Sequence, residues 1–143
     1  MIRAAMALQI LLLVYHQVTT LFDFYPFNGV RFYTAKEQWQ ECAVNGILMV
    51  LPIIGFGSRI THLMRFGAVY YFVLLAVELK IWWVPYLFGA SEKWRRDHGR
   101  IHAGTVTVLP PIKSHPIPNL EHLILQALTV LTAIATLLAW LGP

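Results

Sequence analysis

Glu78 is the residue whose type and position in this sequence most favour chemistry. It lies past the midpoint of a long apolar stretch, residues 67–88, and no basic residue stands three or four positions away, where a helix would bring it into contact. Lys80, two positions on, would point to nearly the opposite side of that helix. A carboxyl group in such surroundings is costly, so we expect it to be protonated or held by a partner from another helix. The candidate partners are His16, His122 and a conducted cation.

Other polar side chains interrupt the apolar stretches at a similar depth. Glu41 and Asn45 are four residues apart, as are His122 and Gln126, so each pair shares one face of a helix. If the apolar stretches are helices that alternate in direction, all these groups fall in the half of the membrane that faces the longer loops. The sequence therefore predicts one polar ligand-binding pocket there, formed by Glu78, His16, His122, Asn45 and Gln126.

Each of these side chains also has a purely structural interpretation. Glu41 and Glu121 stand at expected helix starts, where a carboxylate satisfies free amide groups and the helix dipole. Asn45, Gln126 and His122 are residue types that form hydrogen bonds between transmembrane helices. Both interpretations stay open on the sequence alone.

The segment between the last two apolar stretches carries a second group of candidates. His98 and His102 are four residues apart and His115 follows nearby, so these histidines are candidate metal ligands, although further ligands are unspecified. The same segment is basic, which favours an alternative role as a solvated face that holds anionic lipid headgroups. The residues expected to contact those headgroups are Arg95, Arg96 and Arg100.

The elements that position these residues are predicted to cross a membrane. The chain has 143 residues, of which 57% are hydrophobic and 13% charged, and this composition excludes an ordinary water-soluble domain. The apolar residues form four stretches, residues 4–22, 42–57, 67–88 and 120–141. At about 1.5 Å per residue, three of them are long enough for a hydrocarbon core of about 30 Å. The second is short and contains Pro52, so a re-entrant or buried segment is its alternative interpretation.

The connection between the third and fourth stretches is predicted to have two parts. Ser91 can cap an interfacial helix that runs from Glu92 to His102 and stops at Gly104. Residues 109–118 are too rich in proline for regular structure, and Asn119 after them is a suitable cap for the last helix. We therefore expect an all-α integral membrane protein, residues 1–143 forming a single transmembrane domain. It would be a bundle of about four transmembrane helices with an interfacial helix and a proline-rich segment between helices three and four.

Charge and cysteine content narrow the function classes further. The net charge is +4, but the basic residues flank apolar stretches, so we expect membrane lipids as partners and no nucleic acid. The single cysteine, Cys42, excludes an intrachain disulfide. Because Arg3 and the first apolar stretch are not followed by a small-residue cleavage pattern, we expect a retained first helix. The Lys and Arg count predicts that the longer loops are cytoplasmic and both termini outside.

Three functions are compatible with this pattern. The first is binding or transport of a small amphipathic molecule or cation in the predicted pocket. The second is a membrane-embedded enzyme acting on a lipid or isoprenoid, with Glu78 and the histidines as acids, bases or metal ligands. The third is a noncatalytic accessory subunit. Because four helices enclose little volume, we expect a homo-oligomer or a larger membrane complex.

Overall fold

The computed structural model describes residues 1–142, which form helices and connecting loops. Four long helices are apolar and long enough to cross a membrane. They are α1 (Ile2–Leu21), α2 (Ala35–Gly57), α3 (Thr61–Phe88) and α5 (Leu120–Leu141). A short 3-10 helix, η1 (Val30–Phe32), and a short α-helix, α4 (Glu92–His98), lie in the connections. The predicted all-α membrane bundle of four spans is confirmed.

The second helix is longer than its apolar stretch. Thr34 accepts a hydrogen bond from the Glu37 amide, and the Glu37 side chain accepts one from the Thr34 amide, so this capping box starts α2 at Ala35. Pro52 lies inside a continuous helix, and the re-entrant interpretation is wrong. Glu41 lies in the second turn of α2, so the prediction that its carboxylate stabilises a helix start is also wrong.

The caps predicted for α4 and α5 are confirmed, but α4 is shorter than expected. Ser91 Oγ accepts a hydrogen bond from the Trp94 amide at 3.1 Å, and Asn119 Oδ1 accepts one from the His122 amide at 3.1 Å. Helix α4 ends at His98, and the chain continues in turns rather than in a helix to residue 102. Thr107 and Asn119, on either side of the proline-rich segment, form an isolated antiparallel β-bridge.

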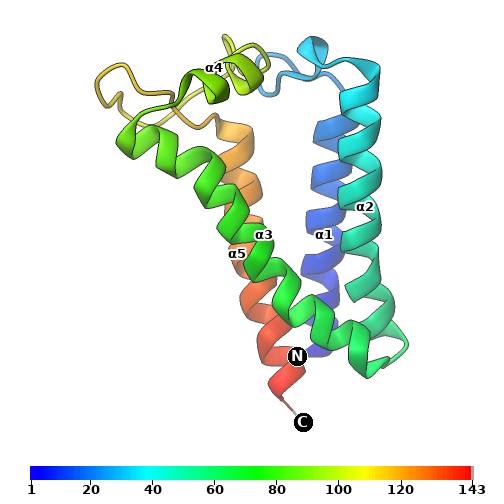
Figure 1. The fold of residues 1–143 in the computed structure, drawn as a ribbon. Coiled ribbons are helices and arrows are strands. Elements are labelled where there is room, and N and C mark those ends of the chain that lie inside the picture. Colours follow the sequence, from blue (N-terminus) through cyan, green and yellow to red (C-terminus); the bar gives the residue numbers. More distant parts are fainter. Residues whose placement is uncertain (143) are drawn as a thin grey trace.

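The four long helices form a bundle that is closed at one end and open at the other. Helices α2 and α3 meet at the short connection near the termini and separate toward the end that carries α4 and the longer loops (Figure 1). At the closed end Gly67 allows this approach, because a Cβ there would lie 2.7 Å from Pro52 Cβ. We call the two ends the loop side and the termini side.

Two buried clusters form the core. The cluster at the middle of the bundle consists of Leu12, Met49, Tyr71 and Ala133. The cluster nearer the termini consists of Ala5, Phe56 and Ala139. Since all four long helices contribute to the middle cluster, the bundle is packed below the loop side.

Candidate functional site: a loop-side cavity

A cavity of about 450 Å³ lies between α2 and α3 at the loop side, and we call it the loop-side cavity. The residues of α2 that line it are Glu37, Gln40, Glu41 and Asn45, and those of α3 are Leu74, Val77, Glu78, Ile81 and Trp82. Its roof is made by α4 and the following turn, through Asp97, His98, Ile101 and His102. Its back wall is made by His16, Tyr33, His122 and Leu125. The four long helices and α4 thus all contribute to one hollow.

The cavity opens sideways, between α2 and α3. Val77 lines it and is 47% exposed, and Gln40 on the facing helix is also exposed. Leu74 and Leu125 line the cavity and also pack against the middle core cluster, which closes the bundle beneath them. Because this opening lies between two spanning helices, a molecule in the bilayer can reach it without leaving the apolar phase.

Glu78 is the most buried carboxylate of the cavity, with 7% of its surface exposed. Thr129 Oγ1 donates a hydrogen bond to Glu78 Oε1 at 3.0 Å, and Glu78 Oε2 is buried without a hydrogen-bond partner among the described residues. Glu78 therefore pairs with Thr129 and not with His16 or His122. Lys80 is exposed on the other side of α3, as its spacing predicted. The carboxylate keeps one acceptor atom unused.

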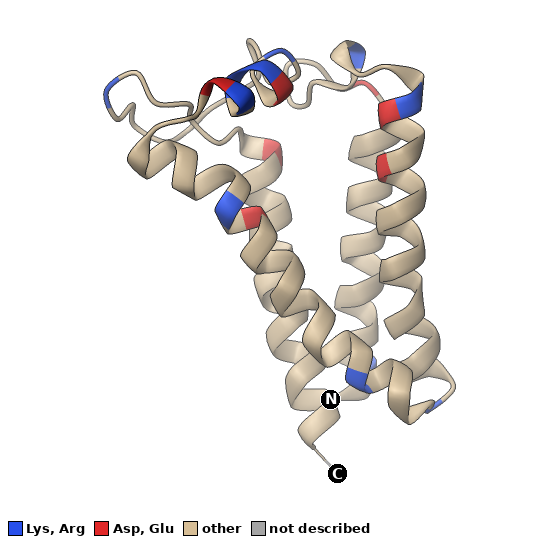
Figure 2. Ribbon diagram, in the orientation of Figure 1, with Lys and Arg blue, Asp and Glu red and all other residues tan. Residues whose placement is uncertain are grey.

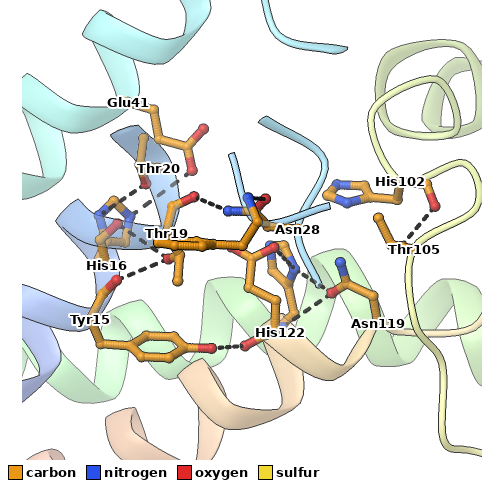
Figure 3. A network of polar contacts seen from close by, with 12 residues as sticks. Tyr15, His16, Thr19, Thr20, Asn28, Glu41, His102, Thr105, Asn119 and His122 are labelled. Carbon is orange, nitrogen blue, oxygen red and sulfur yellow. Dashed lines mark hydrogen bonds and ion pairs between the residues drawn. The ribbon is translucent and has the colours of Figure 1, made fainter. Parts of the chain in front are cut away.

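His16 and His122 lie around a second, smaller hollow behind the cavity. This inner hollow of about 20 Å³ is large enough for a water molecule, and it is also lined by Glu41 and Glu121. His16 Nε2 lies 4.0 Å from Glu41 Oε1 (Figure 3). His122 Nδ1 lies 3.8 Å from Glu121 Oε2. Burial and the neighbouring Glu41 carboxylate raise the pKa of Tyr33, which lines both hollows. Two carboxylate–imidazole pairs thus face one water-sized space.

The orientation of the His122 ring is set by its neighbours. His122 Nδ1 lies 2.6 Å from Asn119 Oδ1, and since a carbonyl oxygen can only accept, the imidazole donates through Nδ1. In the neutral ring Nε2 is then the acceptor. The ring packs against Trp82 at 4.1 Å and His102 at 5.0 Å between centroids. Trp82 thus connects the buried histidine to the roof.

The two remaining predicted pocket residues, Asn45 and Gln126, do not lie together. Asn45 lines the cavity, and its Nδ2 donates to the Glu41 carbonyl at 3.1 Å. Gln126 lies outside the lining, where its Oε1 accepts a hydrogen bond from Trp83 Nε1 at 2.7 Å. The structure therefore brings together four of the five predicted residues and assigns Gln126 to an interhelical hydrogen bond.

The three candidate metal ligands of the loop are not brought together. His98 and His102 both lie in the roof around Trp82, whereas His115 Nδ1 lies 2.9 Å from the Tyr86 carbonyl and is not part of the cavity. In residues 1–142 no group of three or more His, Cys, Asp or Glu side chains is arranged to hold a metal ion. Burial, and then the nearby His98, lower the pKa of His102 to about 3, so this roof imidazole is neutral.

The three arginines expected at lipid headgroups differ in their surroundings. Arg95 and Arg96 are exposed on α4. Arg100 instead donates to Glu37 Oε1 at 3.1 Å and to the Phe32 carbonyl. Arg100 thus ties the roof to the start of α2. Arg96 Nε lies 3.9 Å from Asp97 Oδ1, and Arg95 forms no ion pair within residues 1–142.

Sequence reasoning missed several lining residues, although signals for some were present. Trp82 is one helical turn after Glu78, and Glu37 is one turn before Glu41, so both follow from helical spacing once the helix bounds are known. The capping pattern of Thr34 and Glu37 would have placed the start of α2. No comparable signal placed Asp97 in the cavity, which it lines from the last turn of α4.

The Asp, Glu, Lys and Arg residues that line the cavity are all acidic. Its acidic residues are Glu37, Glu41, Glu78 and Asp97, and none of the lining residues is Lys or Arg. Arg100 pairs with Glu37, and Arg96 lies beside Asp97. Glu41 and Glu78 are thus the lining carboxylates without an arginine partner among the described residues, and a hollow with low-dielectric walls focuses the field of such groups. Neither a protein-family model, a curated protein nor a solved structure matches this chain.

Proposed function

We propose that this membrane protein binds an amphipathic molecule with a positively charged group, such as a lipophilic amine, in the loop-side cavity. The observation that carries the proposal is the buried Glu78 carboxylate, whose Oε2 has no hydrogen-bond partner among the described residues, in the wall of a hollow that no Lys or Arg lines. A ligand ammonium group would supply the missing hydrogen-bond donor and offset the burial of the charge.

The rest of the wall fits the apolar part of such a ligand. Leu74, Val77 and Ile81 follow one another along α3 on the side of the cavity that opens between the helices. A volume of about 450 Å³ lies within the range of about 300–1,000 Å³ that is usual for small-molecule sites. The proposed ligand therefore places its cation at Glu78 and its chain along α3 toward the bilayer.

We propose binding rather than transport because the cavity is closed toward the termini side. Leu74 and Leu125 form part of its wall and at the same time pack on the middle core cluster. A transport pathway would have to pass through that cluster toward the termini side. Binding requires no such rearrangement of the core.

A matched pair of ligands tests the proposal. The purified chain in lipid nanodiscs is titrated with a dansyl-labelled alkyl dimethylamine and with the neutral alcohol of the same chain length, so that partitioning into the bilayer is compared directly. We expect the amine to bind about tenfold or more tightly than the alcohol, equivalent to about 1.4 kcal/mol. Equal affinities in the wild-type protein would contradict the proposal.

Two variants locate the effect. Glu78→Gln should abolish the preference for the amine, because the amide has almost the same size but no charge. The control is Glu92→Gln, since Glu92 is an exposed residue of the first turn of α4 and does not line the cavity. Mass analysis of the recovered ligands detects any conversion, which would favour the membrane-embedded enzyme instead.

A further inference from the structure

Another cavity, of about 510 Å³, lies at the end of the bundle opposite the loop-side cavity. It is formed where the first turn of α1, the end of α2 and the last turn of α5 meet, and we call it the termini-side pocket. Arg3 and Arg59 line it, together with Met6, Phe56 and Ala139. It shares no lining residue with the loop-side cavity.

The charge around this pocket is the reverse of that around the loop-side cavity. Lys and Arg occur at both ends of the bundle, but Asp and Glu occur only in the loop-side half (Figure 2). The ion pairs of the described residues that involve an arginine use Arg31, Arg96 and Arg100. Arg3 and Arg59 therefore form no ion pair within residues 1–142, and their guanidinium groups are available to an external anion.

The wall of the termini-side pocket is apolar below the arginines. Phe56 is 1% exposed and Ala139 is 5% exposed, and both belong to the cluster nearer the termini. Met6 packs against the same cluster. Two guanidinium groups above an apolar wall, at the end of spanning helices, match a phosphate group with acyl chains attached.

The backbone at Arg59 gives an independent indication. Arg59 has φ of +54°, in the left-handed region that favours glycine, and it follows the cap residue of α2. The Ile60 amide donates to the Gly55 carbonyl at 2.8 Å, which completes the hydrogen-bonding pattern in which glycine is the usual residue at this position. An arginine here costs about 1 kcal/mol or more relative to glycine, so its presence has a cost in stability that an anion-binding role would explain.

We propose that the termini-side pocket binds a phospholipid with a net negative headgroup, whose phosphate is held between Arg3 and Arg59 and whose chains lie against Phe56 and Met6. This site does not depend on the loop-side cavity or on its ligand. It adds an anionic-lipid site at the membrane face opposite Arg95 and Arg96.

Native mass spectrometry of the purified full chain in detergent tests this proposal. The protein is offered equimolar phosphatidylglycerol and phosphatidylcholine of the same chain length, and the bound lipids are counted. We expect about fivefold or greater preference for phosphatidylglycerol in the wild-type protein. Arg59→Gly should reduce that preference at least threefold and leave the melting temperature unchanged or higher, because glycine relieves the backbone strain. A change that affected only folding could not produce this combination.

Further variants make the outcome decisive. Arg3→Gln should also reduce the preference, whereas Arg65→Gln, at the same end but outside the pocket, should not. Unchanged phosphatidylglycerol binding in the Arg3→Gln, Arg59→Gly double variant would overturn the proposal, as would loss of the preference only in an Arg95→Gln, Arg96→Gln variant. Displacement of the lipid by millimolar inorganic phosphate would assign a free-phosphate site and overturn the lipid assignment.

Discussion

Buried polar residues occur in both halves of the bundle, but their surroundings differ. On the termini side Gln9 Nε2 donates to Thr136 Oγ1 at 3.0 Å, and both residues are fully buried in tight packing between α1 and α5. On the loop side some of the buried polar groups are ionisable, and three of these, Glu78, His16 and His122, line a hollow. A buried polar residue inside a membrane bundle therefore does not by itself indicate a ligand-binding site. What distinguishes the loop-side cavity is unfilled space beside buried groups that can carry charge, whereas the arginines of the termini-side pocket are exposed.

The largest expected difference between the loop side and the termini side is in their response to a larger side chain. Val77→Trp places a large ring in the mouth of the loop-side cavity, so the affinity for the dansyl amine should fall by about tenfold or more while the melting temperature changes little. Ala5→Leu adds bulk where Ala5 is fully buried against Phe56 and Ala139, and should destabilise the fold by about 1–3 kcal/mol. Thermal unfolding in detergent and ligand titration measure the two effects. Equal destabilisation by both substitutions would show that the loop side is as tightly packed as the termini side.

Acidification should act on the roof of the loop side and not on the termini-side core. Burial lowers the folded-state pKa of His102 to about 3, whereas its unfolded-state pKa is about 6.5. Below pH of about 6.5 the unfolded chain therefore binds a proton that the folded chain does not, and the free energy of unfolding decreases as the pH falls toward 3. At pH 5 the loss amounts to at most about 2 kcal/mol. Hydrogen exchange of residues 99–106, corrected for intrinsic rates, should accelerate between pH 7.5 and 5. The His102→Gln variant should show a flatter dependence, and an identical dependence would assign the effect to other groups.

A smaller contrast is expected from two threonines of α5. Thr129→Val removes the hydrogen bond that holds Glu78 Oε1, and should weaken binding of the amine about fivefold, in line with about 1 kcal/mol for one hydrogen bond. Thr132→Val removes a longer contact of 3.4 Å to the Leu8 carbonyl in the packed part of the bundle, and should leave the affinity unchanged. Titration of both variants with the same amine provides the comparison. A similar loss in both would mean that Thr129 acts only through packing.

The smallest expected effect concerns the link between the roof and α2. Because the Arg100–Glu37 pair is exposed, Arg100→Gln should change the free energy of unfolding by less than about 1 kcal/mol. Without the link the roof is freer to move, so association of the amine should become severalfold faster. Stopped-flow fluorescence measures the rate, and Arg95→Gln on the exposed face of α4 is the matched control. Unchanged kinetics would show that Arg100 does not restrict entry.

Much of the scaffold followed from the sequence, because hydropathy and helix caps are local properties. The apolar stretches marked the spans, and Ser91 and Asn119 were recognised as caps from residue type and position. The start of α2 was missed because hydropathy locates the hydrocarbon core, whereas the first two turns of α2 are polar. The opposite directions of Glu78 and Lys80 on α3 followed from helical spacing alone.

The site was predicted less completely because it depends on contacts between elements distant in sequence. That Glu78 pairs with Thr129 and Gln126 with Trp83 requires the register of α3 against α5, which no local pattern contains. The roof residues reach the cavity because α4 ends at His98 and the chain then turns. Such turns follow from tertiary packing, and helical spacing could not place them.

Photocrosslinking tests the central claim most directly, because it reports where the ligand lies. The chain in nanodiscs is irradiated with an alkyl dimethylamine that carries a diazirine near its nitrogen, and the labelled residues are identified by mass spectrometry. The account predicts labels within residues 37–45 of α2 and 74–82 of α3, lost in Glu78→Gln and displaced by excess unlabelled amine. Labels spread evenly over the lipid-facing surfaces, or unchanged in Glu78→Gln, would contradict it.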